Sequence, residues 1–339
     1  MKMLRIESIG RLARLALVAS VAVLSLSVAA HAADGAKGKK VLMLQSFAAH
    51  PYVAGIIKSF RERATALGMD VTILAAGLDA ALQARQMDDG LARKYDLIAL
   101  APISEQGIIP SLARAKQAGI PVVLVNNPAK VGSEDYFLTF VGQDQTEQGR
   151  QSAEAMLQAL KASGRSGKVA KVALITGALS QGIGPRRVDG IKEVFAKHKN
   201  EVQVVAIEDG KWDTATSERI AGQLYARFAA SGGLDLVYGM ADNQAVAAIK
   251  AAQAAGIDVG IGPKKLAVVG ATCLKEGIAA VRAGQMYATL AQIPTTLGVL
   301  AADTIDAYFN GKTPPKFTYM PVDIITKANV DKWAGPCTY

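Results

Sequence analysis

Polar and aromatic side chains stand directly after the apolar segments of this 339-residue chain. Eight of them combine amide, charged, hydroxyl and ring groups: Tyr52, Asn126, Asn127, Arg187, Trp212, Asp242, Thr272 and Gln292. Amides donate and accept hydrogen bonds at once, which suits the hydroxyl groups of a small polar ligand. Flat aromatic faces suit the C–H side of a sugar or polyol ring. These residue types predict a binding site for such a molecule.

Most of these side chains also have a purely structural explanation. The alternatives are turn formation by Asn126-Asn127-Pro128, packing of Tyr52 and Trp212 under a neighbouring loop or helix, a surface ion pair at Arg187, a helix N-cap at Asp242 and backbone pairing at Gln292. Asp144, which follows another apolar segment, is expected to be a structural cap. The sequence alone leaves these alternatives open.

Motifs for catalysis and for metal binding are weak. Outside the first 32 residues the histidines are His50 and His198, and neither has another candidate metal ligand near it in sequence. The segment ALSQG at 178–182 departs from the nucleophile elbow because Ala178 stands where a glycine is needed. The chain also has no phosphate-binding lysine loop and no dinucleotide glycine triplet after its first apolar segment. We therefore expect no metal, no cofactor and no enzyme activity, with an exported enzyme as the weakest alternative.

The first 32 residues have the pattern of a secretory signal peptide. Four basic residues precede the apolar run at 15–30, and Ala30-His31-Ala32 fits a small-x-small cleavage site. A membrane anchor is the alternative, but the run is short for a span and no later run reaches spanning length. The pattern predicts an exported protein cleaved near Ala32.

The charge of the chain is moderately basic. Loss of the signal segment, with its four basic residues and Glu7, would lower the net charge from +9 to +6. There is no Arg-rich run and no alternation of basic and aromatic residues, which argues against nucleic-acid binding. The remaining charge indicates either a solvated basic surface or a preference for an acidic ligand or partner.

Two cysteines, Cys273 and Cys337, would both remain in the exported chain. Export permits a disulfide between them, and two free thiols are the alternative. A bridge would close a long loop and contribute about 4 kcal/mol by the loop-entropy model.

Short apolar segments alternate with amphipathic ones along the chain. The predicted strands lie at 41–47, 69–76, 96–102, 120–127, 137–141, 171–177, 202–210, 234–241, 265–272, 286–293 and, interrupted, 317–326. Helices are predicted between them, with a start signal at Thr146 and Glu147 in one case and Asp213 as N-cap in another. This order predicts two doubly wound parallel α/β lobes, with 141–158 as the crossover between them. Such sheets bind ligands at the carboxyl ends of their strands, so we expect the eight side chains to converge there.

The order of several motifs resembles one family. They are Pro51-Tyr52 in the first loop, VVLVNN at 122–127, VGQDQTEQG at 141–149, Arg187-Val188-Asp189-Gly190 at a helix start, MADNQAVAAI at 240–249, VVGAT at 268–272 and YATLAQIP at 287–294. With the signal peptide, they make the chain similar to periplasmic solute-binding proteins of the ribose-binding type, the type I fold used by ABC importers. The resemblance covers nearly all of the mature chain.

This resemblance implies three hinge crossings, near Gly142-Gln143, Gln292-Ile293 and Pro321. Lobe one would then be residues 40–142 with 293–320, and lobe two residues 143–292 with 321–339. It also implies a periplasmic monomer that closes around its ligand and presents it to a membrane permease. A sensory protein that reports to a chemoreceptor or sensor kinase would have the same fold.

The family's ligand contacts carry over unevenly. Tyr52, Arg187, Trp212 and Gln292 match contact positions of the family. At other contact positions this chain departs from the family pattern. Asn126-Asn127 occupy the place of an acid–arginine pair, and Thr272 occupies the place of an acid. Ala241 replaces the Asn that precedes Asp242, and Ala101 replaces a polar residue. The resemblance therefore implies a small ligand with fewer hydroxyl groups than ribose.

Overall fold

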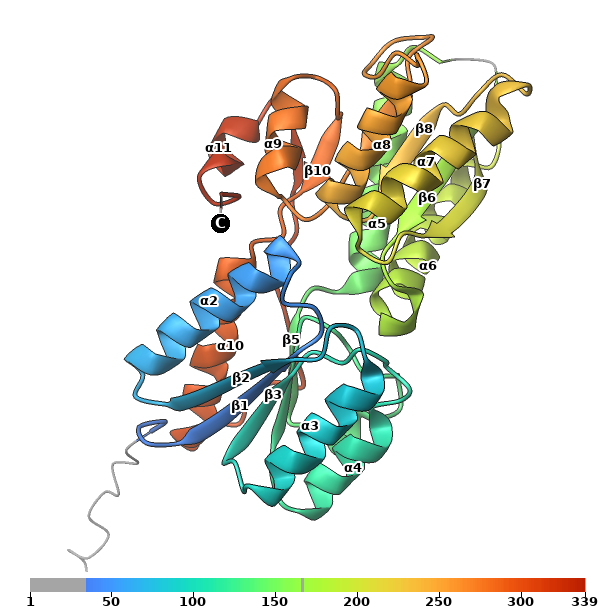
Figure 1. Cartoon of the computed structure of the whole chain (residues 1–339). Helices are drawn as coiled ribbons and strands as arrows, with labels where there is room; N and C mark the ends of the chain where they lie inside the picture. Colours follow the sequence, from blue (N-terminus) through green and yellow to red (C-terminus); the bar gives the residue numbers. More distant parts are fainter. Residues whose placement is uncertain (1–34, 166–167, 339) are drawn as a thin grey trace, which may run out of the picture.

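Two six-stranded sheets, each covered by helices, make up the chain (Figure 1). The computed structural model describes residues 35–165 and 168–338. The predicted signal peptide lies outside these described residues. Each sheet and its helices form one lobe, and Figure 1 shows the lobes joined by segments near the middle of the molecule.

The sheet of the first lobe has the strand order β11-β5-β4-β3-β1-β2, and all its pairs are parallel. Its strands are β1 (Lys40–Gln45), β2 (Asp70–Ala75), β3 (Leu97–Leu100), β4 (Val122–Val125), β5 (Thr139–Gly142) and β11 (Phe317–Tyr319). Its helices are α2 (Pro51–Ala66), α3 (Ala80–Ala92), α4 (Ile109–Gln117) and α10 (Pro294–Phe309), with a short 3₁₀ turn η1 (Glu134–Tyr136).

Side chains of β1 pack into a separate hydrophobic core on each face of that sheet. Val41 and Met43 pack into the core with α2 and α10, whereas Leu42 and Leu44 pack into the core with α3 and α4. Because successive side chains of a strand point to opposite faces, a strand buried on both sides is apolar throughout. This explains the continuous apolar run in the sequence.

The sheet of the second lobe has the order β12-β10-β9-β8-β6-β7. Its strands are β6 (Ala170–Thr176), β7 (Val202–Asp209), β8 (Leu236–Gly239), β9 (Ala267–Val269), β10 (Ala288–Leu290) and β12 (Ile324–Thr326). Its helices are α5 (Gln145–Ala162), α6 (Ile183–Phe195), α7 (Thr214–Ala229), α8 (Asp242–Ala254), α9 (Lys275–Arg282) and α11 (Val330–Ala334), with 3₁₀ turns η2 (Leu179–Gln181) and η3 (Ala196–His198).

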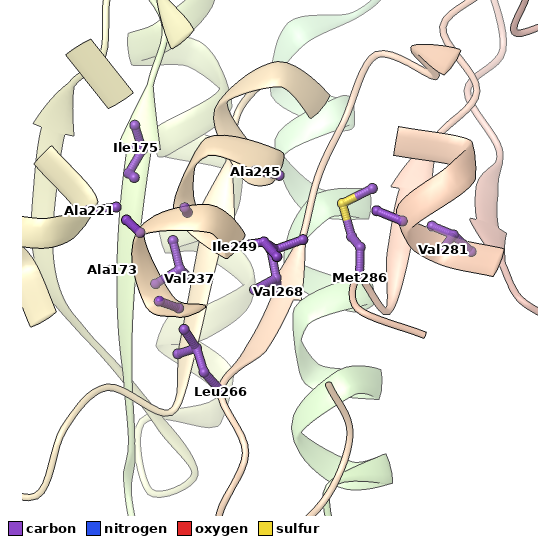
Figure 2. Close-up of a cluster of buried hydrophobic side chains, with 14 of the residues drawn as sticks. Ala173, Ile175, Ala221, Val237, Ala245, Ile249, Leu266, Val268, Val281 and Met286 are labelled. Carbon is purple, nitrogen blue, oxygen red and sulfur yellow. The ribbon is translucent and has the colours of Figure 1, made fainter. Parts of the chain in front are cut away.

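One core of the second lobe lies between α8 and the sheet. Figure 2 shows Ala245 and Ile249 of α8 near Val237 of β8 and Val268 of β9. Small side chains on α8 let the helix lie close to the strands, which suits an alanine-rich sequence.

The chain passes between the sheets three times. It leaves the first sheet after β5, returns to it between β10 and β11, and crosses again between β11 and β12. The predicted two-lobed type I architecture is confirmed. The segment 317–326, predicted as one interrupted strand, is two strands in different sheets, and β12 runs antiparallel to β10.

Helix starts agree with local chemistry, with one correction. Asp213 caps α7 as predicted, since its Oδ1 accepts from the Thr216 backbone N–H at 2.7 Å. Asp144 caps α5, as expected from the sequence, so this helix begins at Gln145 and not at the start signal of Thr146. The Asp144 carboxylate accepts from the backbone N–H groups of Thr146 and Glu147, both at 3.0 Å.

Cys273 and Cys337 form a disulfide with their Cα atoms 5.2 Å apart. The bond ties the end of the chain after α11 to the loop that follows β9, and both cysteines are fully buried. Among the helices of residues 35–165 and 168–338, none combines the length and apolar composition needed to cross a bilayer.

Candidate functional site

A cavity lies where the carboxyl ends of strands from both sheets meet. Its volume is about 40 Å³, against roughly 10–15 Å³ for one water, so it suits a small ligand. The lining comes from both lobes and from the crossing after β10: Ser46, Phe47, His50, Tyr52, Val53, Asn126, Asn127, Gln181, Ile183, Arg187, Trp212, Thr272 and Gln292. Seven of the eight predicted site residues are in this group, and Asp242 is not.

The two lobes touch beside the cavity, so the structure is a closed arrangement. Arg186 of α6 donates to Glu105 Oε2 at 3.1 Å and to the Ala129 carbonyl at 2.8 Å, and both acceptors belong to the first lobe. The Glu105 backbone N–H also lies 3.4 Å from the Ser180 carbonyl. These contacts were not predicted from the sequence.

Arg187 is buried in the cavity wall, with 2% of its surface exposed. Its guanidinium donates to Gln145 Oε1 at 2.8 Å, to the Met240 carbonyl at 3.1 Å and to Gln292 Oε1 at 3.4 Å. Burial lowers the pKa of this guanidinium from its ordinary value. The surface ion pair that was the structural alternative is therefore wrong for Arg187.

Close packing of α5 against α6 positions Arg187. A Cβ added at Gly149 would lie 2.2 Å from the Arg187 carbonyl oxygen, and one at Gly190 would lie 2.0 Å from the Thr146 carbonyl oxygen. Both glycines belong to motifs singled out in the sequence. They let two helix backbones approach more closely than any side chain permits.

The Trp212 ring lies over the end of β6. A Cβ at Gly177 would lie 2.0 Å from the ring, so only a glycine fits beneath it. Its indole N–H donates to Gln181 Oε1 at 2.5 Å. The Arg187 guanidinium is 5.9 Å from the ring centroid, within cation–π range. The ring is thus held by side chains of the cavity itself.

Several residues that line the cavity have strained backbone conformations. Asn126, Trp212 and Thr272 have positive φ values of 68°, 59° and 94°, in a region that non-glycine residues adopt at a cost of about 1–3 kcal/mol each. The value at Thr272 is unusual because its side chain is β-branched. Cys273, the next residue, also has a positive φ of 53° and is anchored by the disulfide. The bridge therefore helps hold Thr272 in the cavity wall.

Tyr52 and His50 form the wall contributed by the start of α2. The Tyr52 hydroxyl accepts from Gln143 Nε2 at 3.2 Å, and burial raises the pKa of Tyr52 to about 12. His50 caps α2, since its Nδ1 accepts from the Tyr52 backbone N–H at 3.2 Å. Burial lowers the pKa of His50 to about 4, against a smaller opposing effect of Asn243.

His50 and Gln181 line the cavity but were not among the eight predicted site residues, and His50 was weighed as a metal ligand. A signal for His50 existed: it directly precedes Pro51, a proline that begins a helix at a strand's carboxyl end. Gln181 has the same kind of signal, because it lies in the segment directly after β6. Within the described residues, no group of three or more His, Cys, Asp or Glu side chains could hold a metal ion.

Three amide side chains have a structural role and also line the cavity: Asn126, Asn127 and Gln292. Asn126 Nδ2 donates to Asn127 Oδ1 at 2.7 Å, and Asn127 Nδ2 donates to the Pro102 carbonyl at 2.8 Å. The turn explanation and the binding explanation therefore hold together. Gln292 accepts from Arg187 with Oε1, while its Nε2 has no hydrogen-bond partner.

Asp242 is fully buried behind the cavity. Its carboxylate accepts from Thr289 Oγ1 at 2.6 Å and from the Leu274 backbone N–H at 2.7 Å. Burial raises its pKa well above the ordinary value. It does not cap α8, where Ala241 is the N-cap residue. Its backbone N–H donates to Thr272 Oγ1 at 3.1 Å, so Asp242 supports a wall residue.

Similarity to known proteins agrees with this geometry. Residues 41–313 match the family model described as "Periplasmic binding protein domain". The D-allose-binding periplasmic protein of Escherichia coli K12 is 28% identical, over 79% of this chain and 84% of that protein. The ribose import binding protein RbsB of Haemophilus influenzae is 24% identical, over 81% of this chain and 86% of that protein.

A solved structure has the same fold. It is the periplasmic binding protein of the arabinose ABC transporter from Shewanella sp. ANA-3, bound to α- and β-L-arabinofuranose. That protein is 24% identical, with a TM-score of 0.79 over 88% of this chain and 95% of the other. The match of the family model over most of the chain, on a fold with a cavity between two lobes, shows that this protein belongs to the periplasmic binding protein family.

Proposed function

We propose that this protein is the exported solute-binding component of an ABC importer, and that it captures a small sugar, polyol or related hydroxylated compound. One observation carries the proposal: amides, a guanidinium and an indole ring from two lobes surround a single cavity beside the crossings. The relatives named for D-allose and ribose binding support the ligand class.

Capture works through lobe closure. Tyr52, Asn126 and Asn127 belong to the first lobe, and Arg187, Trp212 and Thr272 to the second. A ligand in the cavity gains hydrogen bonds from both sets only when the lobes are closed, so binding shifts the population toward the closed state. We assign residues 40–142 with 293–320 to lobe one and residues 143–292 with 321–339 to lobe two.

The partners and location follow from the same proposal. The closed protein, acting as a monomer in the periplasm after cleavage near Ala32, presents a surface from both lobes to a membrane permease. No covalent step is needed, because the protein only holds the ligand and releases it. The family's members named here are binding proteins, which supports a role other than catalysis.

Binding and melting experiments test the proposal. The mature protein is titrated with pentoses, hexoses, polyols and the acids derived from them, by calorimetry and by thermal shift. Saturable binding of at least one compound, weakened by Trp212→Ala without loss of the folded state, is the expected result. Normal binding by both Trp212→Ala and Arg187→Ala would show that the ligand binds elsewhere.

A further inference from the structure

The ligand cavity holds one permanent positive charge and no negative one. Arg187 is the cation, and the described residues that line the cavity include no Asp or Glu. The cavity wall therefore holds a guanidinium with no carboxylate among the lining residues to balance it.

The hydrogen bonds of Arg187 do not balance its charge. They go to two amide oxygens, on Gln145 and Gln292, and to one backbone carbonyl. The hydroxyl of Tyr238, whose pKa burial raises, is a further neutral partner. A guanidinium has five N–H donors, so at least one remains available to a ligand. Burying a charge without a counter-ion is costly, and a bound anion would offset that cost.

One further buried donor lies in the cavity wall. Gln292 directs its oxygen to Arg187, which leaves its Nε2 without a hydrogen-bond partner among the described residues. Gln292 is 1% exposed. His50 also lines the wall, but its Nδ1 accepts from the Tyr52 backbone N–H and its side chain is hydrogen-bonded to Asn243. The unpartnered atom of Gln292 is therefore a donor that a ligand can use.

The buried acid Asp242 lies behind the cavity and is not part of its lining. Both oxygens of Asp242 already accept hydrogen bonds, from Thr289 and from the Leu274 backbone. Burial also raises the pKa of Asp242, which favours its protonated, neutral form.

We propose that the ligand is a small polyhydroxylated carboxylate, such as a sugar acid, rather than a neutral sugar. Its carboxylate lies against Arg187, with the Nε2 donor of Gln292 within the same cavity. Its hydroxyl groups meet the amides of Asn126 and Asn127, and its ring lies on Trp212. The proposal rests on the function proposed above. The net charge, which falls from +9 to +6 without the signal segment, adds a long-range attraction for anions.

Matched pairs of a sugar and its acid test the proposal. Calorimetry on the mature protein at pH 7 compares D-glucose with D-glucuronate and D-galactose with D-galacturonate, pairs that keep the ring and differ in the oxidised C6. The acid of at least one pair should bind about 100-fold more tightly than its sugar. A neutral sugar that binds as tightly as its acid would overturn this proposal and leave the transport function standing. Binding of no member of either pair would overturn this proposal, and absence of binding by polyols and pentoses as well would overturn the transport function.

A single substitution tests whether Arg187 causes the preference for the acid over the neutral sugar. Gln292→Glu places a carboxylate where an amide oxygen already accepts from the guanidinium, and should weaken binding of the acid about 100-fold. Gln158→Glu makes the same change in net charge on an exposed position of α5 and is the matched control. An unchanged preference for the acid in folded Gln292→Glu would contradict the assignment. Asn126→Asp, an isosteric change on the opposite wall, provides a second test if Gln292→Glu does not fold.

Discussion

The two walls of the cavity are built in different ways. The first lobe contributes neutral groups, Tyr52, Asn126 and Asn127, held by hydrogen bonds alone. The second lobe contributes the charge and the indole ring, and its wall is also fixed by glycines between α5 and α6 and by the disulfide beside Thr272. We expect the second wall to be the more rigid of the two, because close backbone packing and a covalent bond constrain it.

Removal of the disulfide should have the largest effect on the second lobe. Cys337→Ser opens a loop with a sequence separation of 64 and should lower the free energy of unfolding by about 4 kcal/mol. Denaturant unfolding, followed with and without reductant, measures the loss. Reductant should weaken the wild-type protein by the same amount and leave the variant unchanged. Equal stabilities of the two proteins would show that the bridge does not anchor this wall.

Truncation of one side chain from each wall compares their contributions to binding. Arg187→Ala should raise Kd by about 100-fold, because the buried guanidinium holds three protein acceptors in the cavity wall and, on our proposal, also donates to the ligand. Asn127→Ala should raise it by about tenfold, since a neutral hydrogen bond contributes about 1 kcal/mol. Calorimetry with the best ligand of the panel gives both values. A larger loss for Asn127→Ala would reverse the comparison between the walls.

His50 makes the first lobe sensitive to pH. Its pKa is about 4 in the folded protein, against an ordinary value of 6.5, so between these values the unfolded state binds more protons. Stability should therefore fall as the pH drops from about 6.5 to about 4, by at most about 3 kcal/mol from this residue. His50→Asn keeps a side chain that can cap α2 but does not titrate. The difference between the stability profiles of the wild-type protein and of His50→Asn gives the contribution of His50 separately from that of Asp242. Parallel profiles would show that His50 does not cause the loss of stability at low pH.

The glycines between α5 and α6 should be sensitive to a single methyl group. Gly149→Ala forces the helices apart at the Arg187 backbone and should lower the free energy of unfolding by about 2 kcal/mol. Gly222→Ala, in α7, is the matched control, because a Cβ there would meet nothing within 4 Å. That change should stabilise the protein by about 0.5–1 kcal/mol through helix propensity. Thermal melts in which both substitutions shift the melting temperature in the same direction would contradict the packing argument.

Much of the architecture could be predicted from local pattern. The apolar segment at β1 is continuous because the strand is buried on both faces, and Asp213 was predicted as an N-cap because short acidic side chains bind free backbone N–H groups. The motifs with Gly149 and Gly190 were noticed, but the reason for the glycines is a contact between helices that the sequence does not display. The lobe boundaries and the ligand roles of the site residues remain predictions.

By itself, the sequence determined the alternation of strands and helices, and therefore the strand ends at which a ligand would bind. These follow from hydrophobic periodicity and capping, which act over a few residues. Only the tertiary structure decided that Asp242 lies behind the cavity, that His50 and Gln181 line it and that Glu105 meets Arg186 across the lobes. Those outcomes depend on how helices and loops distant in sequence pack together, and that packing leaves a buried guanidinium without a carboxylate.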